Sequence, residues 1–96
     1  MVCIEFEWDE AKRIQAIEKH GVDFADAPFL WSSPMVVAGD NRKDYGEPRF
    51  IALGRLKGRV MVVVYTYRGA GVVRIISFRK ANSREVKAYE SALLSR

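Results

Sequence analysis

Arg79 and Lys80 are the residues best placed for chemistry, because they end a strand-like segment directly before a predicted helix. The N-terminus of a helix presents free N–H groups, so cations beside it can hold a phosphate from two sides. We interpret this point as the strongest local anion site of the chain, with a solvated strand end as the alternative. The only histidine, His20, ends another predicted helix and could act as a general acid or base, although a structural role is more common there.

The sequence contains no arrangement typical of the common phosphate-binding loops or of a metal centre. It has neither a GxxxxGK[ST] nor a GxGxxG motif, and a single histidine cannot form the HExxH pair of zinc enzymes. Asp40, Asp44 and Glu47 cluster in one polar segment, but such a segment is far more often solvated than bound to a divalent ion. We therefore expect a site with no metal and no cofactor.

Positive charge is concentrated in the second half of the chain. Residues 1–48 contain ten acids and five Lys or Arg, a balance of −5, whereas residues 49–96 contain two acids and eleven Lys or Arg, a balance of +9. Because these bases alternate with apolar residues in strand-like segments, we expect an ordered surface that meets phosphates. The alternative is that the two halves neutralise each other in the folded protein.

Apolar periodicity and capping residues predict the elements that position these groups, in the order β-α-α-β-β-β-β-α. The predicted elements cover residues 4–8, 10–20, 24–31, 35–38, 49–56, 59–68, 72–80 and 82–94. The residues that cap, kink or turn the chain at or within these bounds are Asp9, Gly21, Asp23, Pro28, Lys57, Gly58, Asn82 and Glu85. Four consecutive strands after two helices indicate an α+β protein.

Strand alternation assigns the side chains of the predicted sheet to two faces. With Leu56 opposite Arg59 and Arg68 opposite Val72, the face that the first two helices should cover holds Ile51, Leu53, Val60, Val62, Val64, Ile76 and Phe78. The opposite face then holds Phe50, Ala52, Gly54, Arg59, Met61, Val63, Tyr65, Tyr67, Ser77 and Arg79. Its small residues, tyrosines and arginines could accept a nucleotide. A slip of one residue would exchange the two faces.

The length of 96 residues suits one domain, which we expect to span residues 1–96. The single cysteine, Cys3, excludes an internal disulfide. The longest uninterrupted apolar run, residues 60–65, is far shorter than the roughly 20 residues of a membrane span. We recognise no secretory signal, and we expect a cytoplasmic protein that does not bind membranes.

Three stretches of the sequence together resemble the BrnT family of bacterial toxins. They are Phe6-Glu7-Trp8-Asp9-Glu10-Ala11-Lys12, then Lys19-His20-Gly21-Val22 with Phe24, and Arg74-Ile75-Ile76-Ser77-Phe78-Arg79-Lys80-Ala81 with Glu85 and Tyr89. Phe78, where the family often has a small residue, and Pro28 depart from the family pattern. The resemblance implies a RelE-like α+β fold, with an antiparallel sheet, two N-terminal helices on one face and a C-terminal helix.

The resemblance also implies a function and a partner. The activity would be that of a metal-independent ribonuclease that blocks translation. A BrnA-type antitoxin with a ribbon-helix-helix domain would neutralise it, and operator DNA would be bound only through that antitoxin. The implied reaction is attack of the ribose 2′-OH on its own 3′ phosphate, for which DNA lacks the nucleophile.

Arg79 is the residue that we expect to stabilise the extra negative charge of the transition state, with Lys80 or Arg49 assisting. His20 or Tyr65 could move a proton. The expected RNA-binding residues are Arg55, Arg59, Tyr65, Tyr67 and Arg74. The predicted register places Arg59 and Arg79 diagonally on one face, as a phosphate clamp.

Two other function classes fit the same residues. The chain could be a nucleic-acid-binding regulator without catalytic activity that acts with a DNA-binding partner. It could also be an interaction protein whose basic half only neutralises an acidic partner. Cyclic-phosphate ends on RNA would distinguish the ribonuclease from both alternatives.

Overall fold

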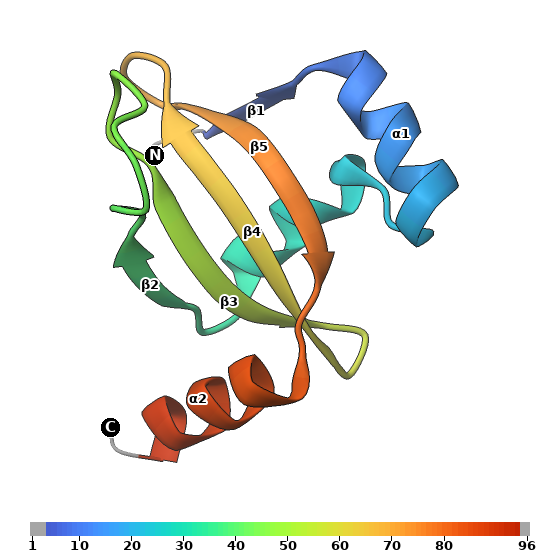
Figure 1. The fold of residues 1–96 in the computed structure, drawn as a ribbon, viewed down its shortest axis with the longest axis vertical. Helices are drawn as coiled ribbons and strands as arrows, with labels where there is room; N and C mark the ends of the chain where they lie inside the picture. The colour runs from blue at the N-terminus through green and yellow to red at the C-terminus, as the bar shows by residue number, and fades with distance from the viewer. Residues whose placement is uncertain (1–3, 95–96) are drawn as a thin grey trace.

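The computed structural model describes residues 4–94, and Cys3 lies outside the described residues (Figure 1). The elements are β1 Glu5–Trp8, α1 Glu10–His20, η1 Phe24–Ser32, β2 Val36–Gly39, β3 Phe50–Leu56, β4 Arg59–Tyr67, β5 Val72–Lys80 and α2 Ser83–Leu94. Their order agrees with the predicted order, and each bound lies within one residue of its prediction. No helix of the described residues is long and apolar enough to cross a membrane.

The five strands form one sheet in the order β1-β5-β4-β3-β2. Three of the four strand pairs are antiparallel, but β1 runs parallel to β5, so the sheet is mixed and the prediction of an antiparallel sheet was wrong. The connection between β1 and β2 contains both α1 and η1, which is long enough for a strand to join the sheet in either direction. Side-chain alternation within a strand carries no information about that direction.

Local chemistry explains the bounds of the first two helices. The carboxylate of Asp9 accepts a hydrogen bond from the backbone N–H of Lys12, and Gly21 ends α1 in the left-handed conformation at φ 66°. Asp23 caps the next helix in the same way, through the N–H of Ala25. The segment that contains Pro28 is a 3₁₀ helix and not the kinked α-helix that we predicted, and Pro28 donates no backbone hydrogen bond to it.

The core lies between η1 and one face of the sheet. Ala52, Met61, Val63, Tyr65 and Ile75 are buried against Phe24, Ala27 and Leu30 of η1 and Ala16 of α1. This face is the one that we expected to remain open, so the predicted assignment of the two faces was wrong. The small residues that could have accepted a nucleotide accept η1 instead: a Cβ atom on Gly54 would lie only 3.1 Å from Cδ2 of Leu30.

A β-bulge in β5 decides where Arg79 points. Both predicted hairpin pairings are present, since Leu56 faces Arg59 and the N–H of Arg68 donates to the carbonyl of Val72. However, Tyr65 faces Ile75 while Val64 faces Ser77, which leaves one extra residue, at position 76, in β5. The extra residue places Phe78 in the core and turns Arg79 to the opposite face, beside Val62.

The two long helices are only loosely attached to the sheet. Ile14 and Ile17 of α1 are 46% and 39% exposed. The helix α2 lies over the β2–β3 side of the sheet, where Tyr89 is buried and its hydroxyl donates to the carbonyl of Pro34 at 3.0 Å (Figure 1). The rest of that sheet face remains uncovered by helices.

Candidate functional site

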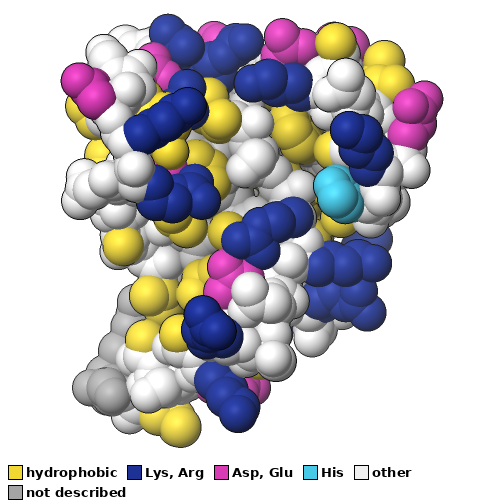
Figure 2. Space-filling model, viewed as in Figure 1, with side chains coloured by type: hydrophobic (Ala, Val, Ile, Leu, Met, Phe, Trp, Pro, Cys, Tyr) yellow, Lys and Arg dark blue, Asp and Glu magenta, His cyan; other side chains and the backbone are white. Residues whose placement is uncertain are grey.

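The open face is the side of the sheet opposite η1, and its centre holds Ile51, Leu53, Val62, Val64 and Ser77. Figure 2 views the molecule from this side and shows Lys and Arg side chains spread between hydrophobic ones. Register and pairing place five arginines on or beside this face, namely Arg42, Arg49, Arg55, Arg74 and Arg79. Four of them were candidate site residues in the sequence, and Arg42 was missed.

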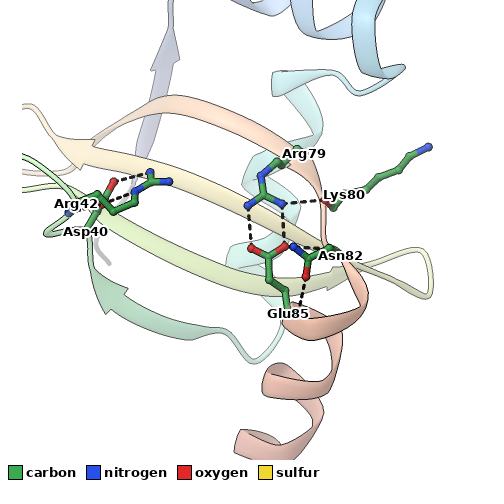
Figure 3. A network of polar contacts seen from close by, with 6 residues as sticks. All are labelled: Asp40, Arg42, Arg79, Lys80, Asn82 and Glu85. Carbon is green, nitrogen blue, oxygen red and sulfur yellow. Dashed lines mark hydrogen bonds and ion pairs between the residues drawn. The ribbon is translucent and has the colours of Figure 1, made fainter.

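Arg79 is held at the N-terminus of α2 by a carboxylate. Its Nη1 and Nη2 atoms donate to the two oxygens of Glu85, each at 2.8 Å, and Nη1 also donates to the carbonyl of Lys80 at 3.2 Å (Figure 3). Glu85 belongs to the predicted capping box, because its Oε1 accepts from the N–H of Asn82 while Asn82 accepts from the N–H of Glu85. Hydrogen bonds from Arg79 lower the pKa of Glu85 to about 2, and Glu85 in turn raises the pKa of Arg79.

Arg42 is fixed in the same manner by Asp40. The Asp40 side chain continues the alternation of β2 onto the open face, where it is completely buried. It accepts hydrogen bonds from Nε and Nη2 of Arg42, at 2.8 and 2.9 Å, and from the hydroxyl of Tyr45 at 3.1 Å. The hydrogen bonds from Arg42 lower the pKa of Asp40 to about 2. The alternation of Val36, Ala38 and Asp40 was the signal that could have revealed this pair.

The other open-face arginines also carry partners. Arg74 pairs with Glu7 of the neighbouring strand at 2.5 Å, and Arg55 lies 3.8 Å from Glu90 of α2. Arg49 pairs with Glu47 at 3.2 Å and stacks on the ring of Tyr45, 4.1 Å from its centroid. Some of the basic half is therefore neutralised by acids of the first half, as the alternative interpretation of the charge pattern proposed.

The remaining predicted cations lie on the other side of the sheet. Arg59 and Lys80, with Lys57, line a pocket of about 240 Å³ beside the β3–β4 hairpin, which we call the hairpin pocket. Because Arg59 shares a face with Met61, and Arg79 shares a face with Val62, the predicted clamp of Arg59 and Arg79 was wrong. Figure 3 shows the Lys80 side chain directed away from the Arg79 guanidinium.

His20 and the tyrosines do not join Arg79. His20 is exposed at the end of α1, next to Gly21 of the hairpin pocket. Tyr65 is 3% exposed and packs against Trp31, with ring centroids 5.0 Å apart, and burial raises its pKa to about 12. The Tyr65 ring is therefore not accessible to a nucleic-acid strand bound at the surface of the protein. Tyr67 is 55% exposed at the far end of the same strand.

The acids that could have held a divalent ion have other partners. Asp40 binds Arg42, Asp44 accepts from the N–H of Gly46 at 2.9 Å, and Glu47 lies between Arg49 and Arg68. Within residues 4–94 no group of three His, Cys, Asp or Glu is placed to bind a metal. The open face can therefore offer fixed guanidinium groups, which suit the non-bridging oxygens of a phosphate.

Two comparisons identify the family. Residues 8–85 match the family described as the ribonuclease toxin, BrnT, of type II toxin–antitoxin systems. The fold matches the crystal structure of the Brucella abortus ribonuclease toxin, BrnT, with a TM-score of 0.63 and 31% sequence identity, covering 83% of this chain and 99% of that chain. No curated protein sequence matches the chain. The chain belongs to the BrnT family of ribonuclease toxins.

Proposed function

We propose that this chain is a metal-independent, RelE-like endoribonuclease in which Arg79 stabilises the phosphoryl transition state. The observation that carries the proposal is the fixed position of Arg79, whose guanidinium lies on the open face beside the N-terminus of α2 and is held by both oxygens of Glu85. Fixed donors stabilise a developing negative charge without having to reorganise during the reaction.

The proposed reaction is an internal displacement at phosphorus. The ribose 2′ oxygen forms a bond to the phosphorus, and the bond from phosphorus to the 5′ oxygen of the next nucleotide breaks. The 2′-OH loses one proton and the leaving 5′ oxygen gains one, so the products are a 2′,3′-cyclic phosphate and a 5′-OH. An anionic, five-coordinate phosphorus lies between these states, and its extra charge is what Arg79 would bind most strongly.

The test is cleavage of a single-stranded RNA by purified protein, with analysis of the product ends. We expect 2′,3′-cyclic phosphates and 5′-OH ends, and a loss of about 10²–10³ in kcat for Arg79→Ala. The matched control is Lys12→Ala, which removes one exposed cation from α1. RNA binding without cleavage would instead support a regulator that lacks catalytic activity.

Metal independence is tested separately. Because the acids of the loop between β2 and β3 are engaged in ion pairs and backbone hydrogen bonds, we expect full cleavage in EDTA. Activity that disappears in EDTA and returns with magnesium, on an unstructured RNA, would contradict the proposal.

The type II family implies an antitoxin partner. We propose a BrnA-type antitoxin with a ribbon-helix-helix domain, which carries the complex to operator DNA, and translation block in the cytoplasm as the cause of growth arrest. Because Arg59 and Arg79 lie on opposite faces, a single inhibitory segment would cover one of them, and we propose the open face. Arg79→Glu should then weaken the complex more than Arg59→Glu, as measured by the dissociation constant.

A further inference from the structure

We propose that Arg42 is a second phosphate-binding residue opposite Arg79, and that Asp40 and Glu85 are positioning residues that aim the two guanidinium groups at one phosphate. This inference rests on the proposed function, because the ligand is the phosphodiester of the RNA that is cleaved. It assigns roles to three residues, Arg42, Asp40 and Glu85, in addition to Arg79.

The hydrogen bonds of Arg79 leave one edge of its guanidinium free. An arginine has five N–H donors in a planar fork. Glu85 takes one hydrogen each from Nη1 and Nη2, and the carbonyl of Lys80 accepts from Nη1 as well. The Nε–H and the second Nη2–H, which lie on a common edge, have no acceptor among residues 4–94. That edge can bind two oxygens of a phosphate.

Arg42 presents the complementary arrangement. Asp40 accepts from Nε and Nη2, so the edge that is free in Arg79 is the occupied edge in Arg42. Besides these bonds to Asp40, the Arg42 side chain interacts with the hydroxyl of Tyr45, which helps to raise the pKa of Arg42, and its Nη1 atom donates no hydrogen bond of good geometry in the described part of the chain. The Arg42 side chain is 64% exposed and that of Arg79 is 46% exposed, so a ligand can reach both free edges.

The two guanidinium groups lie on the same side of the sheet, and each lies within range of the other's charge. Figure 3 shows both in front of the sheet, with Arg42 extending from the loop after β2 and Arg79 from the end of β5. Glu85 raises the pKa of Arg79, whereas the positive charge of Arg42 acts against that increase, so the two cations repel each other. An anion between them would offset this repulsion with two attractions.

Each carboxylate is itself held by a second contact, which is what a positioning role requires. Glu85 cannot move without losing its hydrogen bond to the N–H of Asn82, which caps α2. Asp40 is buried and also accepts from Tyr45 and from the N–H of Arg42. The arginines are therefore aimed by carboxylates that backbone N–H groups hold in place.

The experiment measures kcat and KM on a single-stranded RNA oligonucleotide, and the affinity for the same oligonucleotide with uncleavable 2′-O-methyl groups. Arg42→Gln removes the charge and keeps a donor for the buried Asp40, and it should lower kcat about 10²-fold. Glu85→Gln keeps an acceptor for the capping box and loses the two-oxygen contact to Arg79. Glu85→Gln should lower kcat about tenfold with little change in KM. Glu85→Asp keeps the negative charge but should also have a lowered kcat, because the shorter aspartate side chain does not reach Arg79 in the same position.

A double variant tests whether both arginines bind one phosphate. The combined loss in Arg42→Gln with Arg79→Ala should be clearly smaller than the product of the single losses, because each residue needs the other for its effect. Lys12→Ala again serves as the charge control, and far-ultraviolet circular dichroism checks the fold of each variant.

The outcomes separate this inference from the proposed function. If the wild-type protein does not cleave RNA, the proposed function itself fails. If it cleaves RNA and folded Arg42→Gln retains the wild-type kcat, the role of Arg42 is wrong. If Glu85→Gln retains the wild-type kcat, the carboxylate does not position Arg79. Independent, multiplicative losses in the double variant would place the two arginines on different phosphates.

Discussion

The open face and the hairpin pocket are both basic, but they hold their cations differently. On or beside the open face all five arginines lie within 4 Å of a carboxylate oxygen, namely Arg42, Arg49, Arg55, Arg74 and Arg79. In the hairpin pocket Lys57, Arg59 and Lys80 form no ion pair with any residue between positions 4 and 94. The pocket floor contains Met61 and Phe78, and Asp23 at its edge is already paired with Arg13.

The ion pairs of the open face orient the guanidinium groups. Partly exposed ion pairs contribute only about 0–1 kcal/mol each to stability, so stability alone does not account for five of them on one face. Each ion pair fixes the direction of a guanidinium group and at the same time neutralises its positive charge. The unpaired cations of the hairpin pocket are not neutralised, and no carboxylate of the described residues fixes the orientation of their side chains. They can therefore attract a polyanion over a Debye length of about 8–10 Å.

Replacing an arginine by lysine should have the most different effects on cleavage at the open face and at the hairpin pocket. Arg79→Lys keeps the charge and loses the planar fork, so kcat should fall about 10²-fold. Arg59→Lys should change kcat and KM less than about twofold, because only charge matters at an unpaired position. Initial rates over a range of RNA concentrations measure both. Equal losses at the two positions would show that the pairing has no functional meaning.

The hairpin pocket should control binding and its dependence on salt. Lys57→Ala combined with Arg59→Ala should raise KM several-fold and leave kcat unchanged. For single-stranded nucleic acid, each phosphate contact contributes about 0.7 to the slope of log affinity against log salt, so the slope should fall by about 1.4. Fluorescence anisotropy with the 2′-O-methyl oligonucleotide, at about 50–300 mM salt, gives this slope. An unchanged slope would exclude the pocket from RNA binding.

The elements of the fold could be predicted from the sequence because their determinants are local. Asp9, Gly21 and the Asn82–Glu85 capping box act within a few residues of themselves, and each works as the sequence indicated. The 3₁₀ conformation of the second helix was not predicted, because Pro28 is compatible with more than one kind of helical turn. The parallel β1–β5 pair could not be derived, since it depends on the path of a long connection.

The arrangement of the site could not be predicted, because it depends on one extra residue in β5. The middle strands are apolar on both faces, so alternation alone could not decide which face η1 covers. The bulge at position 76 then separates Arg59 from Arg79, although both hairpin pairings were correct. Arg42 was missed because its loop looked solvated, and only the buried Asp40 shows that it is ordered.

Low pH should weaken the ion pairs of the open face and should not affect the cations of the hairpin pocket, which have no acidic partner in the part of the chain that the structure describes. The pKa of Glu85 falls from 4.5 to about 2 on folding and that of Asp40 from 3.8 to about 2. Because both folded values are depressed, the stabilisation is complete above pH 4.5 and is lost as the pH falls toward 2. Glu85→Gln should remove part of this pH dependence, on the order of 1 kcal/mol. Thermal unfolding across that pH range measures it, and Lys57→Ala with Arg59→Ala should follow the wild-type curve.

The smallest expected effect concerns the turn that presents the hairpin pocket. Lys57 has a left-handed backbone at φ 51°, and Gly58 follows at φ 79°. Asn-Gly is the preferred sequence for such a turn, because asparagine tolerates this conformation better than lysine does. Lys57→Asn should therefore stabilise the fold by about 0.5 kcal/mol, which would raise the melting temperature by a few degrees. The same change should weaken RNA binding by removing one unpaired cation. Greater stability with weaker binding would show that the lysine is kept at this backbone conformation for its charge, whereas unchanged affinity would show that the turn is only structural.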